Sequence, residues 1–440
     1  MIHDLAHLVY RFGSPVLGHR RRAFFRIHRL LAHQILDQTN LSRLLLLQTK
    51  LVSEIRRVEK AIRKSKSRLR KAQERGHDAA INPLLEHVEE LRLANYAWHM
   101  IGDAIAFLYL DKYALKQVYY KTFSPEPKQD AGFLTDKAGF AAEMQTLKSL
   151  ARDGTPALLC DLTNTIRHGD VCVLLGPEPK LIEVKAGAKG SRGRRQGADI
   201  AKLHEFFEND VVRNLRGHAE LHRVEGPSDE QTYSEEMSRC IDHARTHGWS
   251  VRNPEPGLLY AAMFENAEVA DIVGEIKKLQ SPVVFQLNEY KANRNWSPYY
   301  PFTLSILSPR DVFDFIRGQF ILLVAFDIEL MRQEIERRAG CTASLHPGDD
   351  YPIKYSAGPS TPQGGVSMHF LTRIGLEFLS PSSAVDHLTS SLSGVVARLQ
   401  APADGRAMKS KEIDFSQTDA MPEQSAEGGV IAPRPLHSPP

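Results

Sequence analysis

The spacing of apolar and polar positions is helical in the first part of the chain. Apolar residues within 41–75 recur at intervals of three, four and seven, which is typical of a helix with a coiled-coil seam. They are Leu44, Leu51, Ile55, Val58, Ile62 and Leu69. Breaks follow at Gly76 and at Asn82-Pro83, and a second helical stripe occupies 84–108. We therefore predict an antiparallel helical hairpin within residues 1–123.

The first arm of this hairpin is strongly basic. From Glu54 to Arg75 it holds ten Lys or Arg residues against three Glu. A charged exterior and a nucleic-acid contact explain this excess equally well. The apolar seam can pack against the second arm or join two chains, so a homodimer through the coiled coil is an open alternative.

Shorter apolar runs between 156 and 185 predict β-strands. Two of them flank the turn Gly176-Pro177-Glu178-Pro179, which a strand could not contain because proline cannot donate to a ladder. A tight hairpin around this turn would place Asp170 opposite Lys185 and diagonal to Glu183. We therefore expect two carboxylates and an ammonium at one end of the hairpin.

These side chains have the chemistry of a phosphodiester-cleaving site. Asp170, Glu183 and the backbone carbonyl of Val184 offer oxygen ligands to Mg²⁺ or Mn²⁺ and leave positions open for water and phosphate. The cation would lower the pKa of a bound water, and Lys185 would stabilise the transition state. Charges at the edge of an apolar sheet favour this interpretation over a solvated surface.

At these residues the chain resembles the PD-(D/E)xK nuclease superfamily, which has the restriction-endonuclease-like fold. The resemblance covers residues 139–265, and the predicted elements follow the αβββαβ order of that core. They are a helix at 139–150, a strand at 156–163, the hairpin, a helix at 197–210 and a strand at 258–264. The expected fold class is α/β, with this core between an N-terminal α-helical hairpin and a C-terminal α+β extension.

The resemblance also assigns roles to individual residues. It implies that Asp170 and Glu183 bind Mg²⁺ or Mn²⁺ and that Lys185 is the catalytic lysine. It implies a further catalytic carboxylate on the first helix, at Glu143. The proline of the family's name is replaced here by His168-Gly169.

A glycine-rich basic segment follows the proposed catalytic lysine. Its cations and one amide are candidates for binding the phosphate backbone. These residues are Lys189, Arg192, Arg194, Arg195 and Gln196. Some branches of the superfamily have a glutamine at the position of Gln196, but the tyrosine that often follows it is Ile200 here.

Two further features have competing explanations. Asp103 lies beside Gly102 in an apolar helix, and we expect close helix packing with a buried partner for the carboxylate rather than catalysis. Lys291, Trp296 and Tyr299 mix cations and aromatic rings as single-strand binders do, but a packed loop is the favoured interpretation. A strand at 282–287 and a helical region at 309–338 are expected around them.

The 440 residues are enough for several domains. We predict a helical domain at 1–123, a linker at 124–137, a nuclease-like core at 138–270, an α+β region at 271–400 and a disordered tail at 401–440. Four cysteines without metal-finger spacing are expected to be free thiols. The net charge is only +3, so nucleic-acid binding must rest on local clusters.

The chain has no stretch with the features of a secretory signal or a membrane span, so a cytoplasmic protein is expected. The predicted function is a metal-dependent deoxyribonuclease, with DNA as the partner and a restriction or anti-phage defence system as its setting. An ATPase or regulatory activity would have to come from a partner protein. An RNA nuclease and a non-catalytic nucleic-acid-binding scaffold are the alternatives.

Overall fold

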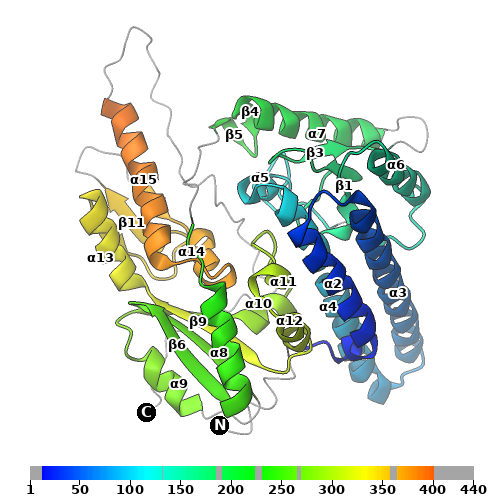
Figure 1. Cartoon of the computed structure of the whole chain (residues 1–440), viewed down its shortest axis with the longest axis horizontal. Coiled ribbons are helices and arrows are strands. Elements are labelled where there is room, and N and C mark those ends of the chain that lie inside the picture. Colours follow the sequence, from blue (N-terminus) through cyan, green and yellow to red (C-terminus); the bar gives the residue numbers. More distant parts are fainter. Residues whose placement is uncertain are drawn as a thin grey trace. The chain divides into compact units, whose positions relative to one another are not determined.

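The computed structural model describes residues 12–130, 132–184, 191–222, 230–264, 269–356 and 364–400 (Figure 1). They fall into two compact units. The first unit takes the described residues within 1–223 and 288–321, and the second unit takes those within 224–287 and 322–440. The chain is mixed α/β, with small antiparallel sheets and an N-terminal helical region. This division differs from the expected boundaries, because the segment 288–321 packs with the N-terminal residues.

The N-terminal region is a bundle of three helices. They are α2 (Arg21–Leu36), α3 (Leu41–Glu74) and α4 (Asp78–Tyr109), preceded by η1 (Pro15–Arg20). The hairpin of α3 and α4 was predicted, and α2, which packs against both, was not. Helix α4 begins at Asp78, before Pro83, so the helix continues through the break that was expected at this proline. A proline in the second turn removes only one intrahelical hydrogen bond.

The seam of α3 is covered within the same chain. Seam residues from Leu44 to Ile62 are buried, and α3 packs against α4 along its length. The intramolecular use of the seam is therefore the one that the structure shows. A homodimer would need another surface.

A helix, three short strands and a second helix follow one another as predicted. They are α6 (Phe140–Arg152), β1 (Ala157–Leu159), β2 (Val171–Val173), β3 (Lys180–Ile182) and α7 (Ser191–Asn209). The strands form an antiparallel meander in the order β1-β2-β3. The first strand is shorter than expected, because η2 (Cys160–Leu162) is a 3-10 turn.

The predicted register of the hairpin is wrong by two residues. Val171 pairs with Ile182, so Asp170 lies opposite Glu183 rather than Lys185. The reason is the length of the turn. Leu174 does not pair with a residue across the turn. Its N–H instead donates to the carbonyl of Pro156, which directly precedes the neighbouring strand β1. The loop between the strands is therefore longer than the four turn residues.

The predicted last strand of the core does not join this sheet. After α7 come β4 (Val211–Leu215) and β5 (His218–His222), which pair only with each other among the described strands. The expected strand is β7 (Leu258–Met263), in the sheet of the second unit. At β1, the side-chain amide of Gln48 donates to the carbonyl of Ala157 at 2.9 Å and accepts from the N–H of Leu159 at 3.0 Å. A side chain of α3 thus satisfies backbone groups that another strand could have used.

The second unit is built on a four-stranded antiparallel sheet with the order β6-β7-β9-β8. Its other strands are β6 (Trp249–Glu255), β8 (Pro282–Gln286) and β9 (Ile321–Asp327). Helices α8 (Ser234–His247), α9 (Val269–Ile276), α13 (Ile328–Ala339), α14 (Met368–Leu376) and α15 (Pro381–Gln400) accompany it. A small sheet contains β10 (Thr342–Leu345), β11 (Ile353–Ser356) and β12 (Gly364–Val366). The region expected to be helical at 309–338 is interrupted by β9, whose apolar run is a buried inner strand.

The remaining helices of the chain are short. They are α5 (Lys112–Gln117), α10 (Leu287–Ala292), α11 (Phe302–Ser305) and α12 (Pro309–Ile316). Between them the aromatic segment is packed, as expected: Trp296 is fully buried and Tyr299 nearly so. The ammonium of Lys291 is also buried and donates to the carbonyl of Phe315. This segment is therefore core rather than a surface for stacking bases.

All four cysteines are free thiols, and three of them are buried. Among the described residues, no helix is both long and apolar enough to cross a membrane. The predicted tail at 401–440 lies outside the described residues.

Candidate functional site

Three carboxylates of the first unit converge on one ammonium group. The Nζ of Lys137 lies 2.6 Å from Oδ2 of Asp161, 2.8 Å from Oε1 of Glu143 and 3.1 Å from Oδ1 of Asp170. Only 28% of the Lys137 side chain is exposed, against 3% for Glu143. Burial alone would lower the pKa of Lys137, but its ion pairs outweigh that effect and raise it. Lys137 is therefore a permanent cation at this position.

Each acid comes from a different element of the αβββα segment. Glu143 lies in the first turn of α6, and Asp161 lies in the 3-10 turn that ends β1. Asp170 immediately precedes β2, where its N–H donates to the carbonyl of Ile182. Glu183 directly follows β3, opposite Asp170. The meander thus gathers at one end four carboxylates that are far apart in the sequence.

The segment that carries Lys137 is held by α3. Glu59, buried in α3, accepts the backbone N–H groups of Leu134 at 2.9 Å and Thr135 at 2.7 Å. Arg63 donates to the carbonyl of Thr135 at 2.6 Å and pairs with Asp136. Because both backbone and side-chain groups are engaged, these contacts fix the chain just before Lys137. The N-terminal helical region therefore helps to build the site.

Two of the four acids resist ionisation. Burial is the largest cause of the raised pKa of Glu143, and Lys137 offsets it only in part. Burial also raises the pKa of Glu183, and repulsion by Asp170 and a hydrogen bond with Asp170 add to it. Two carboxyl groups that face each other in this way disfavour a second negative charge. The cluster has four acids, and one ammonium contacts three of them.

A second lysine lies next to a neutral histidine at this site. The Nζ of Lys128 is 3.1 Å from Nδ1 of His168, whose Nε2 is 2.9 Å from the carbonyl of Tyr120. Burial lowers the pKa of His168 to about 4, so the ring is neutral at pH 7. Its Nε2–H then donates to Tyr120, and Nδ1 accepts from Lys128. Lys128 also acts electrostatically on Glu183, whose pKa it lowers against the larger effect of burial.

The structure brings together three predicted site residues, Glu143, Asp170 and Glu183. Val184 contributes differently from the prediction, since its backbone N–H donates to Oδ2 of Asp170 at 2.9 Å. Lys185 lies outside the described residues.

The predicted phosphate-binding segment is described only in part. Lys189 and the side chains of Arg192 and Arg194 lie outside the described residues. Arg195 is exposed and Gln196 is half-buried, both in the first part of α7.

Sequence reasoning missed Lys137 and Asp161. Lys137 ends a segment that was interpreted as a linker, and its partners are 24 and 33 residues away along the chain at Asp161 and Asp170. Asp161 did carry a signal. It is a charged residue directly after the apolar run 156–160, as Asp170 is directly before one.

The donor set agrees in chemistry with a hard divalent cation, because all four acids offer oxygen ligands. In the described part of the chain, however, no group of three or more Asp, Glu, His or Cys residues is arranged to hold a metal ion. The position shared by three of the carboxylates is taken by the ammonium of Lys137. The residues therefore fit a metal ion only if Lys137 moves away from that position.

A separate buried carboxylate, Asp103 on α4, has a structural role. Its Oδ1 accepts the N–H groups of Asn164 and Thr165, both at 2.9 Å, and its Oδ2 accepts the side-chain amide of Asn164 at 2.7 Å. Burial raises its pKa to about 6. A Cβ at Gly102 would lie 1.8 Å from the carbonyl of Leu162, so only glycine permits this close approach. The expected buried partner of Asp103 is confirmed, and the close packing at Gly102 is against the 3-10 turn η2 rather than against another α-helix.

Comparison with known proteins finds no matching family model, no similar curated protein and no similar solved structure. Any function for this chain therefore rests on its own residues.

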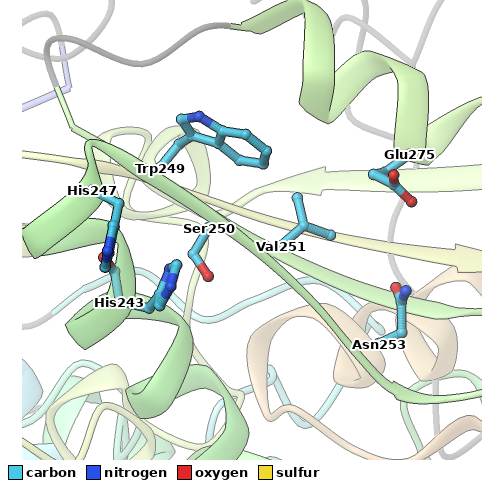
Figure 2. A pocket seen from close by; sticks show the side chains of 7 residues that line it. All are labelled: His243, His247, Trp249, Ser250, Val251, Asn253 and Glu275. Carbon is cyan, nitrogen blue, oxygen red and sulfur yellow. The ribbon is translucent and has the colours of Figure 1, made fainter.

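The second unit has an open pocket of its own (Figure 2). His243 and His247 on α8 stack their rings with centroids 4.1 Å apart at one side, and Glu275 on α9 lies at the other. Residues of β6, including Trp249, lie between them. No residue of the carboxylate cluster lines this pocket, and Glu275 is already paired with Lys278 at 2.6 Å.

Proposed function

We propose that this protein is a nuclease that hydrolyses phosphodiester bonds with Mg²⁺ or Mn²⁺, and that DNA is its substrate. One observation carries the proposal. Glu143, Asp170 and Glu183 meet at one end of an αβββα segment, and these are the residues that the resemblance to PD-(D/E)xK nucleases picks out. Asp161 adds a fourth carboxylate to the same place. These four acids outnumber the single ammonium that contacts three of them, which supports a site for a further cation.

In this proposal Glu143, Asp161, Asp170 and Glu183 would hold the metal ion once Lys137 has moved away. When bound, such an ion lowers the pKa of a water ligand and neutralises charge on the phosphate. The protein's own groups supply the rest of the chemistry. Asp170 is oriented by the N–H of Val184. Released from the carboxylates, Lys137 can donate to a phosphate oxygen, and the resemblance to PD-(D/E)xK nucleases assigns the catalytic lysine to Lys185.

The alternative is a non-catalytic nucleic-acid-binding or scaffold protein, and Lys137 is the observation in its favour. An internal ammonium within 3.1 Å of three carboxylates is itself a buried ion-pair network, which can hold a fold together. An RNA nuclease would use the same groups, because the carboxylates do not contact the sugar. A restriction or anti-phage defence setting, with a partner that supplies ATPase activity, remains part of the proposal.

Cleavage assays with the full chain test this function. Linear, circular and single-stranded DNA and an RNA are incubated with Mg²⁺, Mn²⁺ or EDTA, and Asp170→Asn and Lys185→Ala are compared with the native protein. We expect metal-dependent cutting of DNA that falls on the order of 1,000-fold in Asp170→Asn. Asp103→Asn is the matched control, since it changes a buried aspartate outside the cluster and should cut normally.

Each result separates the candidates. Cutting of RNA alone would transfer the proposal to an RNA nuclease. Cutting that survives both Asp170→Asn and Lys185→Ala would place the active site elsewhere. No cutting of any substrate by the native chain would favour the non-catalytic alternative.

A further inference from the structure

The outer face of α3 carries a stripe of cations. Lys50, Arg57, Lys60, Lys64, Arg68 and Lys71 are all exposed and recur with helical spacing. At 1.5 Å per residue, the stripe extends about 30 Å along the helix. We call these six residues the α3 stripe.

The acids of this helix do not neutralise the stripe. Glu54 is buried and forms a two-pronged ion pair with Arg20 of η1, with only a distant contact to Arg57 at 3.8 Å. Glu59 is buried and holds the backbone of the loop that leads to Lys137. Lys60, Lys64 and Arg68 form no ion pair with a described residue. The outer face thus keeps a single sign of charge up to Glu74, near the helix end.

Helix α13 shows that this chain can balance charge on an exposed helix. There Arg332 pairs with Glu329 and Glu336 at 2.6 Å each, and Arg337 pairs with Glu334 at 2.7 Å. Such alternating charges stabilise a helix, whereas like charges three or four residues apart destabilise it. The α3 stripe repeats the unfavourable spacing four times between Arg57 and Lys71. The repulsion between these cations lowers the stability of the helix. A bound polyanion would remove this repulsion by supplying the missing negative charge.

We propose that the α3 stripe binds the phosphate backbone of duplex DNA. The choice of DNA rests on the proposed function, and the geometry supports it. The stripe is straight and regularly charged, and the same helix holds the loop of Lys137 through Glu59 and Arg63. A lipid surface would need an apolar face to insert, but the apolar face of α3 is buried against α4.

Binding in EDTA tests this surface without any cleavage. A fluorescein-labelled 30-base-pair duplex is titrated with the native chain and with the triple variant Lys60→Gln, Lys64→Gln, Arg68→Gln at several salt concentrations. Because each neutralised phosphate contributes about one to the slope of log affinity against log salt, we expect that slope to fall by about three. Affinity at low salt should fall at least ~30-fold. Thermal melting checks that the glutamine variant is folded.

The matched control removes the same net charge from paired cations. It carries Arg239→Gln, Lys278→Gln and Arg337→Gln, each taken from an ion pair in the second unit. It should bind with the native affinity and slope. Equal weakening of DNA binding in both variants, or unchanged binding in the stripe variant, would contradict a role of the α3 stripe in DNA binding. A native chain that binds anionic vesicles but no DNA would contradict it as well. If the native chain binds DNA through the α3 stripe but never cuts it, the proposed nuclease activity is wrong and the proposed DNA-binding surface stands.

Discussion

Two buried clusters of the first unit use aspartate in opposite ways. At Asp103 a single carboxylate receives three hydrogen bonds from Asn164 and Thr165, and no cation is needed. At Lys137 three carboxylates contact one ammonium and a fourth acid, Glu183, lies opposite Asp170, and two of the four have raised pKa values. The Asp103 site completes a fold contact. The Lys137 site gathers four acids, two of them with raised pKa values, a property that functional sites and structural ion-pair networks share.

The largest expected effect on stability is at Asp103. Asp103→Ala leaves the N–H groups of Asn164 and Thr165 without an acceptor, and we expect a loss of about 3 kcal/mol in the free energy of unfolding. Chemical denaturation measures it. Asp170→Asn should change stability by less than about 1 kcal/mol, because it keeps an acceptor for Val184 and relieves repulsion with Glu183. A larger loss of stability in Asp170→Asn than in Asp103→Ala would show that the two sites do not differ in this way.

The sequence predicted the difference between the Asp103 site and the Lys137 site only in part. Asp103 beside Gly102 in an apolar helix was enough to predict packing, because a helix fixes which residues share a face. Asp170 and Glu183 were found because each lies next to an apolar strand. Their pairing was predicted in the wrong register, since hydrophobic spacing does not determine how many residues a turn takes up.

Lys137 could not have been found by spacing. It reaches the acids only because Glu59 and Arg63 hold the preceding loop, and those contacts join residues more than 70 positions apart. The last strand of the expected core was misplaced for a similar reason. Gln48 of α3 occupies the backbone groups of β1, and no local pattern in β1 shows that a side chain will do so.

The next effect concerns competition between Lys137 and a divalent cation. Lys137→Met removes the ammonium from the three carboxylates, so Mn²⁺ should bind more tightly. We expect a decrease of about 10-fold in the dissociation constant, which is about 1.4 kcal/mol of binding free energy. Titration calorimetry measures the affinity. Lys128→Met is the control and should have a smaller effect, because that lysine contacts His168. Weaker Mn²⁺ binding in Lys137→Met would show that Lys137 does not compete with the cation.

The smallest effect is the pH dependence of stability. Burial raises the pKa of Glu143 and Glu183 above the ordinary 4.5, so the folded state binds more protons than the unfolded state above that pH. The contribution of these two groups to stability without metal should therefore fall as the pH rises from 4.5 through the raised pKa values, whereas His168, whose pKa is lowered from 6.5 to about 4, contributes a rise below pH 6.5. Solvent screens both groups in part, so we expect on the order of 1 kcal/mol or less.

Thermal melting across pH in EDTA and in Mn²⁺ measures this dependence. Subtracting the Glu183→Gln curve from the native curve cancels His168, and in EDTA this difference should fall as the pH rises. Mn²⁺ should reduce that fall, because a bound cation favours the ionised acids. A matched variant at an exposed glutamate, Glu235→Gln, should leave the curve unchanged. A difference between the native and Glu183→Gln curves that rises with pH across this range would contradict the raised pKa of Glu183.

The most direct test of the central claim is to locate Mn²⁺ in crystals of the full chain by its anomalous scattering. The account predicts a peak among Glu143, Asp161, Asp170 and Glu183, with the ammonium of Lys137 displaced from the carboxylates. A fully occupied Mn²⁺ elsewhere, with Lys137 still paired to all three acids, would show that the cluster is an internal ion-pair network and not a metal centre.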